Sequence, residues 1–134
     1  MKPEENRRFH LLLKECGYDE EAKKSLVWAF SDEATSSSAD LNPVEVDGLL
    51  RYLQDEHSKK CKPMRGKIIH YLCLLGYTVG NDQADWDRIN AFIKGIGANN
   101  PRKVQLNFLY YSELPKVVSQ VEAMYKHEVK RLAK

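Results

Sequence analysis

The sequence lacks the segments by which a membrane-bound, secreted or disulfide-rich protein is usually recognised. No apolar run approaches the roughly 18 residues that cross a bilayer. The polar start of the chain, from Met1 to Arg8, has no apolar core of a signal peptide. The three cysteines are odd in number and form no Cys-x-x-Cys pair. We therefore expect reduced thiols, a cytoplasmic location and no membrane partner.

The motifs of common enzyme classes are missing as well. The chain has no glycine-rich phosphate loop, no Gly-x-Ser-x-Gly and no His-Glu-x-x-His. His70 and Cys73 have the spacing of two metal ligands on one helix, but a second pair of metal ligands is missing. Glu45 and Glu113 occupy equivalent helix starts, where capping accounts for both carboxylates without catalysis. The prediction is a non-enzymatic protein without a cofactor or a metal.

Composition and charge distribution indicate a soluble chain of two unlike halves. The 134 residues are 43% hydrophobic and 30% charged, which is ordinary for one domain or two very small ones. Residues 1–57 hold 7 Lys/Arg and 13 Asp/Glu, a net charge of −6, whereas residues 58–134 hold 14 and 6, a net charge of +8. Such a division indicates either a nucleic-acid face on the basic half or two halves that attract each other.

Two stretches of the chain, residues 41–53 and 109–121, resemble each other. Leu41 aligns with Leu109 and Glu45 with Glu113. The apolar positions that follow fall at i, i+3, i+4 and i+7, which is one face of a helix. They are Val46, Leu49, Leu50 and Leu53 in the first copy, and Leu114, Val117, Val118 and Val121 in the second.

The first helix of each half repeats too, since the stripe Phe9, Leu12, Leu13, Cys16 before Gly17-Tyr18 matches the stripe Ile68, Tyr71, Leu72, Leu75 before Gly76-Tyr77. Both glycines suit the left-handed residue that ends a helix. Asp19 suits the N-cap of the second helix, and Asn42 with Glu45 forms a capping box for the third. Residues 31–40 and 78–83 are expected to be loops.

The expected fold is all-α, with two pseudo-repeated three-helix units forming a small helical bundle-like protein. The third helix should end near Glu56, and the last should run from about Ser112 to Leu132. The predicted parts are an acidic N-terminal unit (1–57), a basic connector with a proline and a glycine (58–67), and a basic C-terminal unit with a long last helix (68–134).

Two groups of basic residues are candidate phosphate contacts, the sequence-independent part of DNA binding. They are Lys59, Lys60, Lys62, Arg65 and Lys67 in the connector, and Lys126, Lys130, Arg131 and Lys134 on the last helix. A solvated linker and a favourable interaction with the helix dipole explain the same residues without DNA. A helix-turn-helix made of the second and third helices is geometrically conceivable, but residues 31–40 are longer than the turn of that motif.

Two tryptophans are candidate contacts with a protein partner. Trp28 lies off the apolar stripe of its helix, so it meets either the other half of the chain or another protein. Trp86 begins the apolar side of the fifth expected helix. They support a competing prediction, a protein-interaction adaptor that binds a host protein through an apolar helical groove without touching DNA.

Three segments carry a resemblance to a known family. They are the Leu-x-x-Leu-Gly of Leu72 to Gly76, the Ala-Phe-Ile-Lys of Ala91 to Lys94, and the Leu-x-x-x-Glu-Leu-x-x-Val-Val-x-x-Val of Leu109 to Val121. In these features the chain resembles the GemA regulatory proteins of Mu-like phages, over about Arg7 to Met124. The resemblance implies a non-enzymatic phage or prophage protein that modulates host gene expression or DNA topology in a bacterial cell. It supplies no catalytic residues, and the basic segment from Lys126 to Lys134 has no match in it.

The function predicted from these observations is regulation by contact with DNA or with the host transcription or topology machinery, through the basic half. The contact with DNA is inferred from charge and not from the resemblance. Salt separates this prediction from the adaptor, because phosphate contacts weaken steeply with ionic strength and an apolar groove does not.

Overall fold

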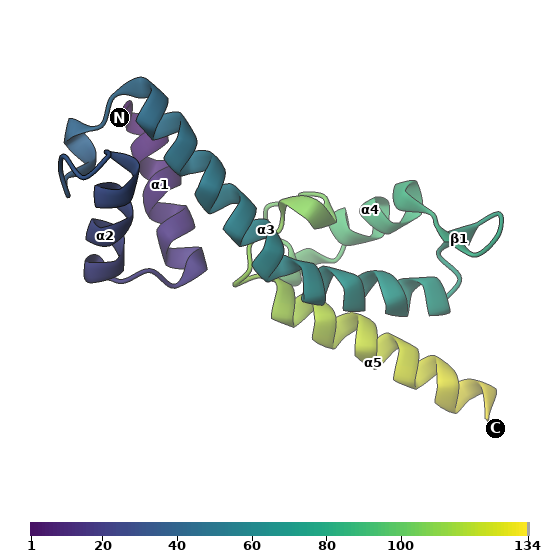
Figure 1. Cartoon of the computed structure of the whole chain (residues 1–134). Coiled ribbons are helices and arrows are strands. Elements are labelled where there is room, and N and C mark those ends of the chain that lie inside the picture. The colour runs from purple at the N-terminus through teal and green to yellow at the C-terminus, as the bar shows by residue number, and fades with distance from the viewer. Residues whose placement is uncertain (134) are drawn as a thin grey trace. The chain divides into compact units, whose positions relative to one another are not determined.

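The computed structural model describes residues 1–133 and is predominantly helical (Figure 1). Lys134, the last of the predicted basic residues, lies outside the described residues. The chain divides into two compact units, Met1–Lys60 (unit 1) and Cys61–Lys134 (unit 2). The expected all-α class is confirmed, with one very short pair of strands as the exception.

Unit 1 begins with α1 (Pro3–Cys16) and α2 (Glu20–Phe30). The turn between them has the predicted geometry: Gly17 has a φ of 79°, and the N–H of Tyr18 donates to the carbonyl of Leu13 at 2.9 Å. Asp19 caps α2 by accepting from the N–H of Ala22 at 2.8 Å. The turn and the cap could be predicted from the sequence because each is closed by hydrogen bonds between residues at most five positions apart.

The segment after α2 contains a short 3₁₀ helix, η1 (Ser38–Asp40), and is held by the buried Ser31. The Ser31 hydroxyl donates to the carbonyl of Thr35 at 2.9 Å and accepts from its N–H at 3.0 Å. The predicted capping box follows, since Asn42 and Glu45 each accept a hydrogen bond from the other's backbone N–H, at 2.8 and 2.9 Å.

Helix α3 (Pro43–Leu74) is far longer than the sequence suggested. The expected end near Glu56 is wrong, and residues 58–67 are helical throughout. The division between the units falls at Lys60–Cys61, inside the predicted connector, but that segment is not an irregular linker. Pro63 and Gly66, which suggested a break, both lie on the exposed side of the helix. The carbonyl of Lys59, to which Pro63 cannot donate, can there be hydrated.

A continuous buried stripe explains why α3 persists. Leu53, His57, Cys61, Ile68 and Leu72 are all buried and follow one another at helical spacing. The core of unit 1 takes the first part of this stripe, together with buried side chains of α1, α2 and the segment before α3: Phe9, Leu12, Leu13, Val27, Leu41, Val46, Leu49, Leu50 and Leu53.

Unit 2 continues from α3 through a two-stranded antiparallel sheet, β1 (Thr78–Val79) and β2 (Gln83–Ala84), into α4 (Trp86–Lys94). The sheet lies in the segment expected to be a loop, and two-residue strands are too short to show alternation. Gly76 has a φ of 97° and Tyr77 donates to the carbonyl of Leu72 at 3.0 Å, as predicted for this turn. Two 3₁₀ helices follow, η2 (Gly97–Asn99) and η3 (Leu106–Phe108).

The last helix, α5 (Leu114–Leu132), begins two residues later than the expected Ser112, and Glu113 is its N-cap residue. Pro115 falls in its first turn, where the missing N–H is tolerated. The core of unit 2 is formed by α3, α4, η3 and α5, with Cys61, Ile68, Leu72, Ile89, Ile93, Leu106, Leu109, Leu114, Val117 and Val121 buried. Helices α3 and α5 lie side by side, and the rings of Tyr71 and Tyr125 are 5.5 Å apart.

Candidate nucleic-acid interface

Three of the predicted basic residues are paired with carboxylates one turn away on their own helix. Lys59 lies 3.9 Å from Glu56 on α3, and on α5 Lys126 lies 2.9 Å from Glu122. Arg131 binds Glu128 through two nitrogens. The hydrogen bonds from Lys126 and from Arg131 lower the pKa of Glu122 and of Glu128 respectively. These three cations are therefore neutralised in part before any partner arrives.

Two further residues hold backbone carbonyls of the fold. In unit 1 the ammonium of Lys60 donates to the carbonyl of Glu15 at 3.1 Å, at the C-terminal end of α1 where a cation is favoured. In unit 2 the Nη2 of Arg65 donates to the carbonyl of Asn107 at 3.0 Å, while its Nε is buried and has no partner among the described residues. The structure thus gives both residues a role in folding.

Lys62, Lys67 and Lys130 make no ion pair or side-chain hydrogen bond among residues 1–133, and all three are exposed. Lys67 on α3 lies near enough to Glu122 on α5 to help lower the pKa of that carboxyl. Glu122 is therefore flanked by Lys67 and Lys126 from two helices, one carboxylate against two ammonium groups. The adjacency of α3 and α5 within unit 2 thus brings one residue of each predicted group, Lys67 and Lys126, to the same carboxylate, whereas Lys59 and Lys60 belong to unit 1.

The two tryptophans lie in different units and are similarly exposed, Trp28 by 46% and Trp86 by 44%. Trp86 is the first residue of α4, directly after the N-cap Asp85, which accepts from the N–H of Arg88 at 3.2 Å. Asp87 follows it. Trp86 thus lies beside two carboxylates and one exposed cation, Arg88, whose guanidinium donates to the carbonyl of Gly76 at 2.9 Å.

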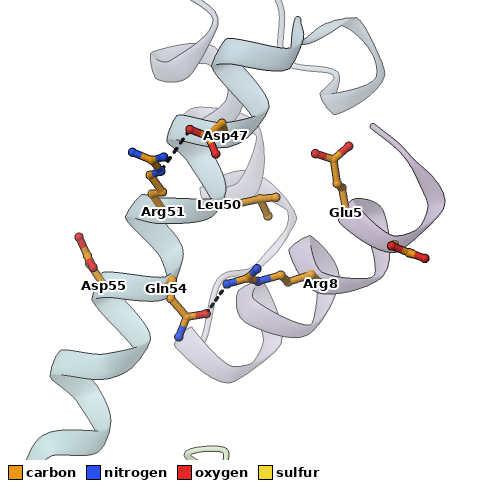
Figure 2. A pocket seen from close by; sticks show the side chains of 8 residues that line it. Glu5, Arg8, Asp47, Leu50, Arg51, Gln54 and Asp55 are labelled. Carbon is orange, nitrogen blue, oxygen red and sulfur yellow. Dashed lines mark hydrogen bonds and ion pairs between the residues drawn. The ribbon is translucent and has the colours of Figure 1, made fainter. Parts of the chain in front are cut away.

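Sequence reasoning missed a groove of about 640 Å³ on unit 1, between α1 and the first part of α3 (Figure 2). It is lined by Glu4, Glu5, Arg8, Asp47, Leu50, Arg51, Gln54 and Asp55. Arg8 donates to the Oε1 of Gln54 at 2.9 Å, and the Nε of Arg51 lies 3.1 Å from Asp47. With four carboxylates and two already-bonded guanidinium groups, the groove disfavours a phosphate ligand. No sequence signal links these residues, because two helices contribute them.

Sequence reasoning also missed a network at the start of α5. Arg102 binds both carboxylate oxygens of Glu113 and donates to the carbonyl of Phe108 at 3.0 Å. Its guanidinium carbon lies 3.9 Å from the centre of the Tyr110 ring, and the N–H of Tyr110 donates to Glu113 at 2.7 Å. Burial alone would raise the pKa of Glu113, but the hydrogen bonds from Arg102 and Tyr110 outweigh it and hold the pKa below its usual value. Phe108, carried by this network, is 63% exposed.

Within residues 1–133 no group of three or more His, Cys, Asp or Glu is placed to hold a metal ion. None of the helices in that part of the chain has the length and apolar character needed to cross a membrane.

The arrangement defines a small helical protein of two units, the second of which presents a basic surface. No protein-family model, no curated protein and no solved structure matches the chain. The resemblance to the GemA proteins therefore rests on the quoted residues alone and stays a prediction.

Proposed function

We propose that this chain is a non-enzymatic regulatory protein of phage or prophage origin that acts in the cytoplasm of a bacterial host. It modulates host gene expression by contact with DNA or with the transcription or topology machinery. Unit 2 makes the contact, through the surface of α3 and α5. The family resemblance supports the origin, and the basic surface supports the contact with DNA.

The observation that carries the proposal is the unneutralised charge of unit 2. Lys62 on α3 and Lys130 on α5 are exposed and have no carboxylate partner among the described residues, and Lys67 on α3 is exposed and shares the single carboxylate of Glu122 with Lys126. Their ammonium groups are free to replace the counterions of a phosphate backbone. Lys59, Lys126 and Arg131 must first give up an ion pair, so we assign them a smaller contribution.

We further propose that the two units are copies of one three-helix ancestor, and that α3 fuses the third helix of the first copy to the first helix of the second. A repeated carboxylate contact supports this. Glu45 accepts from the N–H of Asn42, three residues earlier, at 2.9 Å. Glu113, its partner in the sequence alignment, accepts from the N–H of Tyr110, again three residues earlier, at 2.7 Å.

Other elements recur in the same order. An aspartate caps the second helix of each unit, and a 3₁₀ helix precedes the aligned leucine in each, η1 before Leu41 and η3 before Leu109. Both leucines are buried. In such a duplication one copy is free to keep the fold while the other acquires a binding surface, which accords with the opposite charges of the two halves.

The experiment is a titration of the full chain against a labelled mixed-sequence duplex at several salt concentrations. Three phosphate contacts predict a slope of about −2.7 in log affinity against log salt, and about a 40-fold loss between 50 and 200 mM. The double variant Lys62→Ala, Lys67→Ala should reduce the slope to about −0.9. A matched control, Lys14→Ala with Lys24→Ala, removes the same charge from exposed positions of unit 1 and should leave the slope unchanged.

Two results would overturn direct contact with DNA through this surface. One is the absence of binding by the unaltered chain at 50 mM salt. The other is an equal reduction of the slope by the control pair, which would mean that only the overall charge matters.

A second function, a protein-interaction adaptor, is favoured by one observation. Leu74, Val79 and Trp86 are all exposed and lie close together in the sequence, around the hairpin that leads into α4. Large exposed apolar side chains mark protein contacts, and Asp85 and Asp87 beside Trp86 disfavour phosphate. An adaptor predicts binding to a host protein that Trp86→Ala weakens and that salt leaves nearly unchanged.

A further inference from the structure

Phe108 is the most exposed aromatic side chain that the structure records on unit 2, and its position is fixed from both sides. It ends η3, and 63% of it is exposed. Leu106 before it and Leu109 after it are completely buried in the core of unit 2. The chain therefore enters and leaves the core within four residues and presents Phe108 at the outermost point.

The backbone beneath Phe108 is held by side chains from three parts of unit 2. Arg65 of α3 donates to the carbonyl of Asn107 at 3.0 Å, and Arg102 donates to the carbonyl of Phe108 at 3.0 Å. The N–H of Leu106 donates to the Oδ1 of Asn90 of α4 at 3.2 Å. Because these bonds order the segment before any ligand binds, little conformational entropy remains to be lost on binding.

The arginines that hold the backbone at Phe108 have further basic residues as neighbours on the chain. Arg65 bonds a carbonyl and not a carboxylate, so its charge is uncompensated by that contact. Lys62 lies one turn before Arg65 on α3, and Lys103 follows Arg102 in an exposed position. Glu113 is the carboxylate of the network, and Arg102 neutralises it.

An exposed aromatic ring on an ordered backbone segment, with cations nearby, is the combination by which proteins bind single-stranded nucleic acid, with the ring stacking on a base and the cations contacting phosphates. We propose that Phe108 is a stacking residue for an unpaired base, and that Lys62, Arg65 and Lys103 contact the phosphates on either side. This rests on the proposed contact of unit 2 with nucleic acid and adds to it the kind of strand recognised. Trp86 is less suited to this role, because it is flanked by two carboxylates, Asp85 and Asp87, against the single cation Arg88.

The test measures binding of the full chain to a labelled oligo(dT) strand and to a duplex of the same length. Phe108→Ala should weaken binding to oligo(dT) about 10-fold, since loss of one stacked base has an effect of that order. It should leave the salt slope unchanged, because no charge is removed. Val79→Ala, another exposed apolar side chain of unit 2, is the matched control and should change neither quantity.

A second variant gives a direct signal. Phe108→Trp, with Trp28→Phe and Trp86→Phe to leave one tryptophan, should retain affinity and show quenched fluorescence when oligo(dT) binds, because a stacked indole is quenched by the base. Circular dichroism checks that each variant is folded.

The outcomes separate the two proposals. If the unaltered chain binds both nucleic acids with a salt-dependent affinity that Phe108→Ala leaves unchanged, or if the Phe108→Trp emission is unaltered by binding, stacking is refuted and the phosphate contact stands. If the unaltered chain binds neither nucleic acid at low salt, the proposed function and the stacking role are both refuted.

Discussion

Replacing Glu113 by glutamine tests the network that holds the start of α5 and the segment carrying Phe108. The carboxylate accepts from both Nε and Nη2 of Arg102 and from the N–H of Tyr110. Glutamine keeps the size of the side chain and one acceptor oxygen. It removes the charge and turns an NH₂ group toward a guanidinium that offers only donors.

The expected loss of unfolding free energy is about 1–2 kcal/mol. A fully exposed ion pair contributes about 0.2–1 kcal/mol and a hydrogen bond to a charged group about 1.5–3 kcal/mol. The Glu113 side chain is 19% exposed and that of Arg102 36%, so solvent screens the pair only in part. For a unit of this size the midpoint of thermal unfolding should fall by on the order of 10 °C.

The effect should depend on pH in a defined direction. The pKa of Glu113 is below its ordinary value of 4.5 in the folded chain, so the unfolded chain binds the proton more tightly. The stabilisation is fully present above pH 4.5 and is lost as the pH falls through the folded-state pKa. The difference between the unaltered chain and Glu113→Gln should therefore be largest at neutral pH and should shrink as the pH falls below 4.5 and through the folded-state pKa of Glu113.

Urea unfolding followed by the fluorescence of Trp86, with Trp28→Phe in both proteins, reports on unit 2. Glu128→Gln, which disrupts a similar two-bond contact on the exposed end of α5, is the control and should change the midpoint little. An unchanged midpoint for Glu113→Gln at pH 7 would refute the assigned role of the network. A difference of the same size at low pH would refute the titration argument.

Two further predictions concern unit 1 and α3. Asn42→Ala should destabilise unit 1 by about 1 kcal/mol, because it removes the cap of α3, while Asn42→Asp should be nearly neutral. Urea unfolding followed by Trp28 fluorescence measures both variants. Equal effects of the two substitutions would contradict the capping role. Gly66→Ala should raise the free energy of unfolding by about 0.5–1 kcal/mol, because a Cβ there meets no atom within 4 Å and favours the helix. Gly76→Ala, at a φ of 97°, should lower the free energy of unfolding in the same urea assay. If Gly66→Ala does not stabilise the chain, residues 58–67 are not helical in solution.

The parts of the fold that the sequence predicted correctly are those closed by local contacts. The turns at Gly17 and Gly76, the cap at Asp19 and the capping box of Asn42 and Glu45 each involve residues within five positions of one another. Their residue types are required by backbone geometry, a positive φ or an unpaired N–H, whatever the rest of the chain does.

The full extent of α3 follows from the periodicity of its buried residues and not from its composition, so the predicted end near Glu56 is wrong. Lysines, a proline and a glycine in residues 58–67 are typical of a linker, yet Leu53, His57, Cys61 and Ile68 continue one apolar face through that segment. His57, of which only 4% is exposed, is a polar residue type, so hydropathy alone does not reveal that it belongs to this buried face. A buried face decides helix persistence more strongly than one exposed proline, whose missing hydrogen bond water can replace.

For the candidate site, the sequence identifies the basic residues but not which of them are exposed and unpaired. The sequence supplied eight candidate basic residues within the described chain, and the three that form ion pairs, Lys59, Lys126 and Arg131, each follow a glutamate by three or four positions. Lys62 has no carboxylate at that spacing, but the spacing is informative only once residues 58–67 are known to be helical. The exposure of Phe108 could not be predicted from the sequence either, because Phe108 lies among leucines and tyrosines and its segment has the composition of a core segment. Exposure depends on which neighbours fold back into the core, and that is settled by tertiary packing.

The charge of unit 2 is divided between two ends of the segment that connects α3 to α5. Asp85 and Asp87 flank Trp86 at the start of α4, whereas Arg65 and Arg102 hold the backbone beneath Phe108. Arg88 also lies beside Trp86, so the two exposed aromatic side chains differ in the number of carboxylates next to them, and a polyanion is favoured at Phe108 over Trp86. A chain that contacts both nucleic acid and a host protein can use Phe108 for one and Trp86 for the other. Substitution at either position should then impair one interaction and leave the other intact.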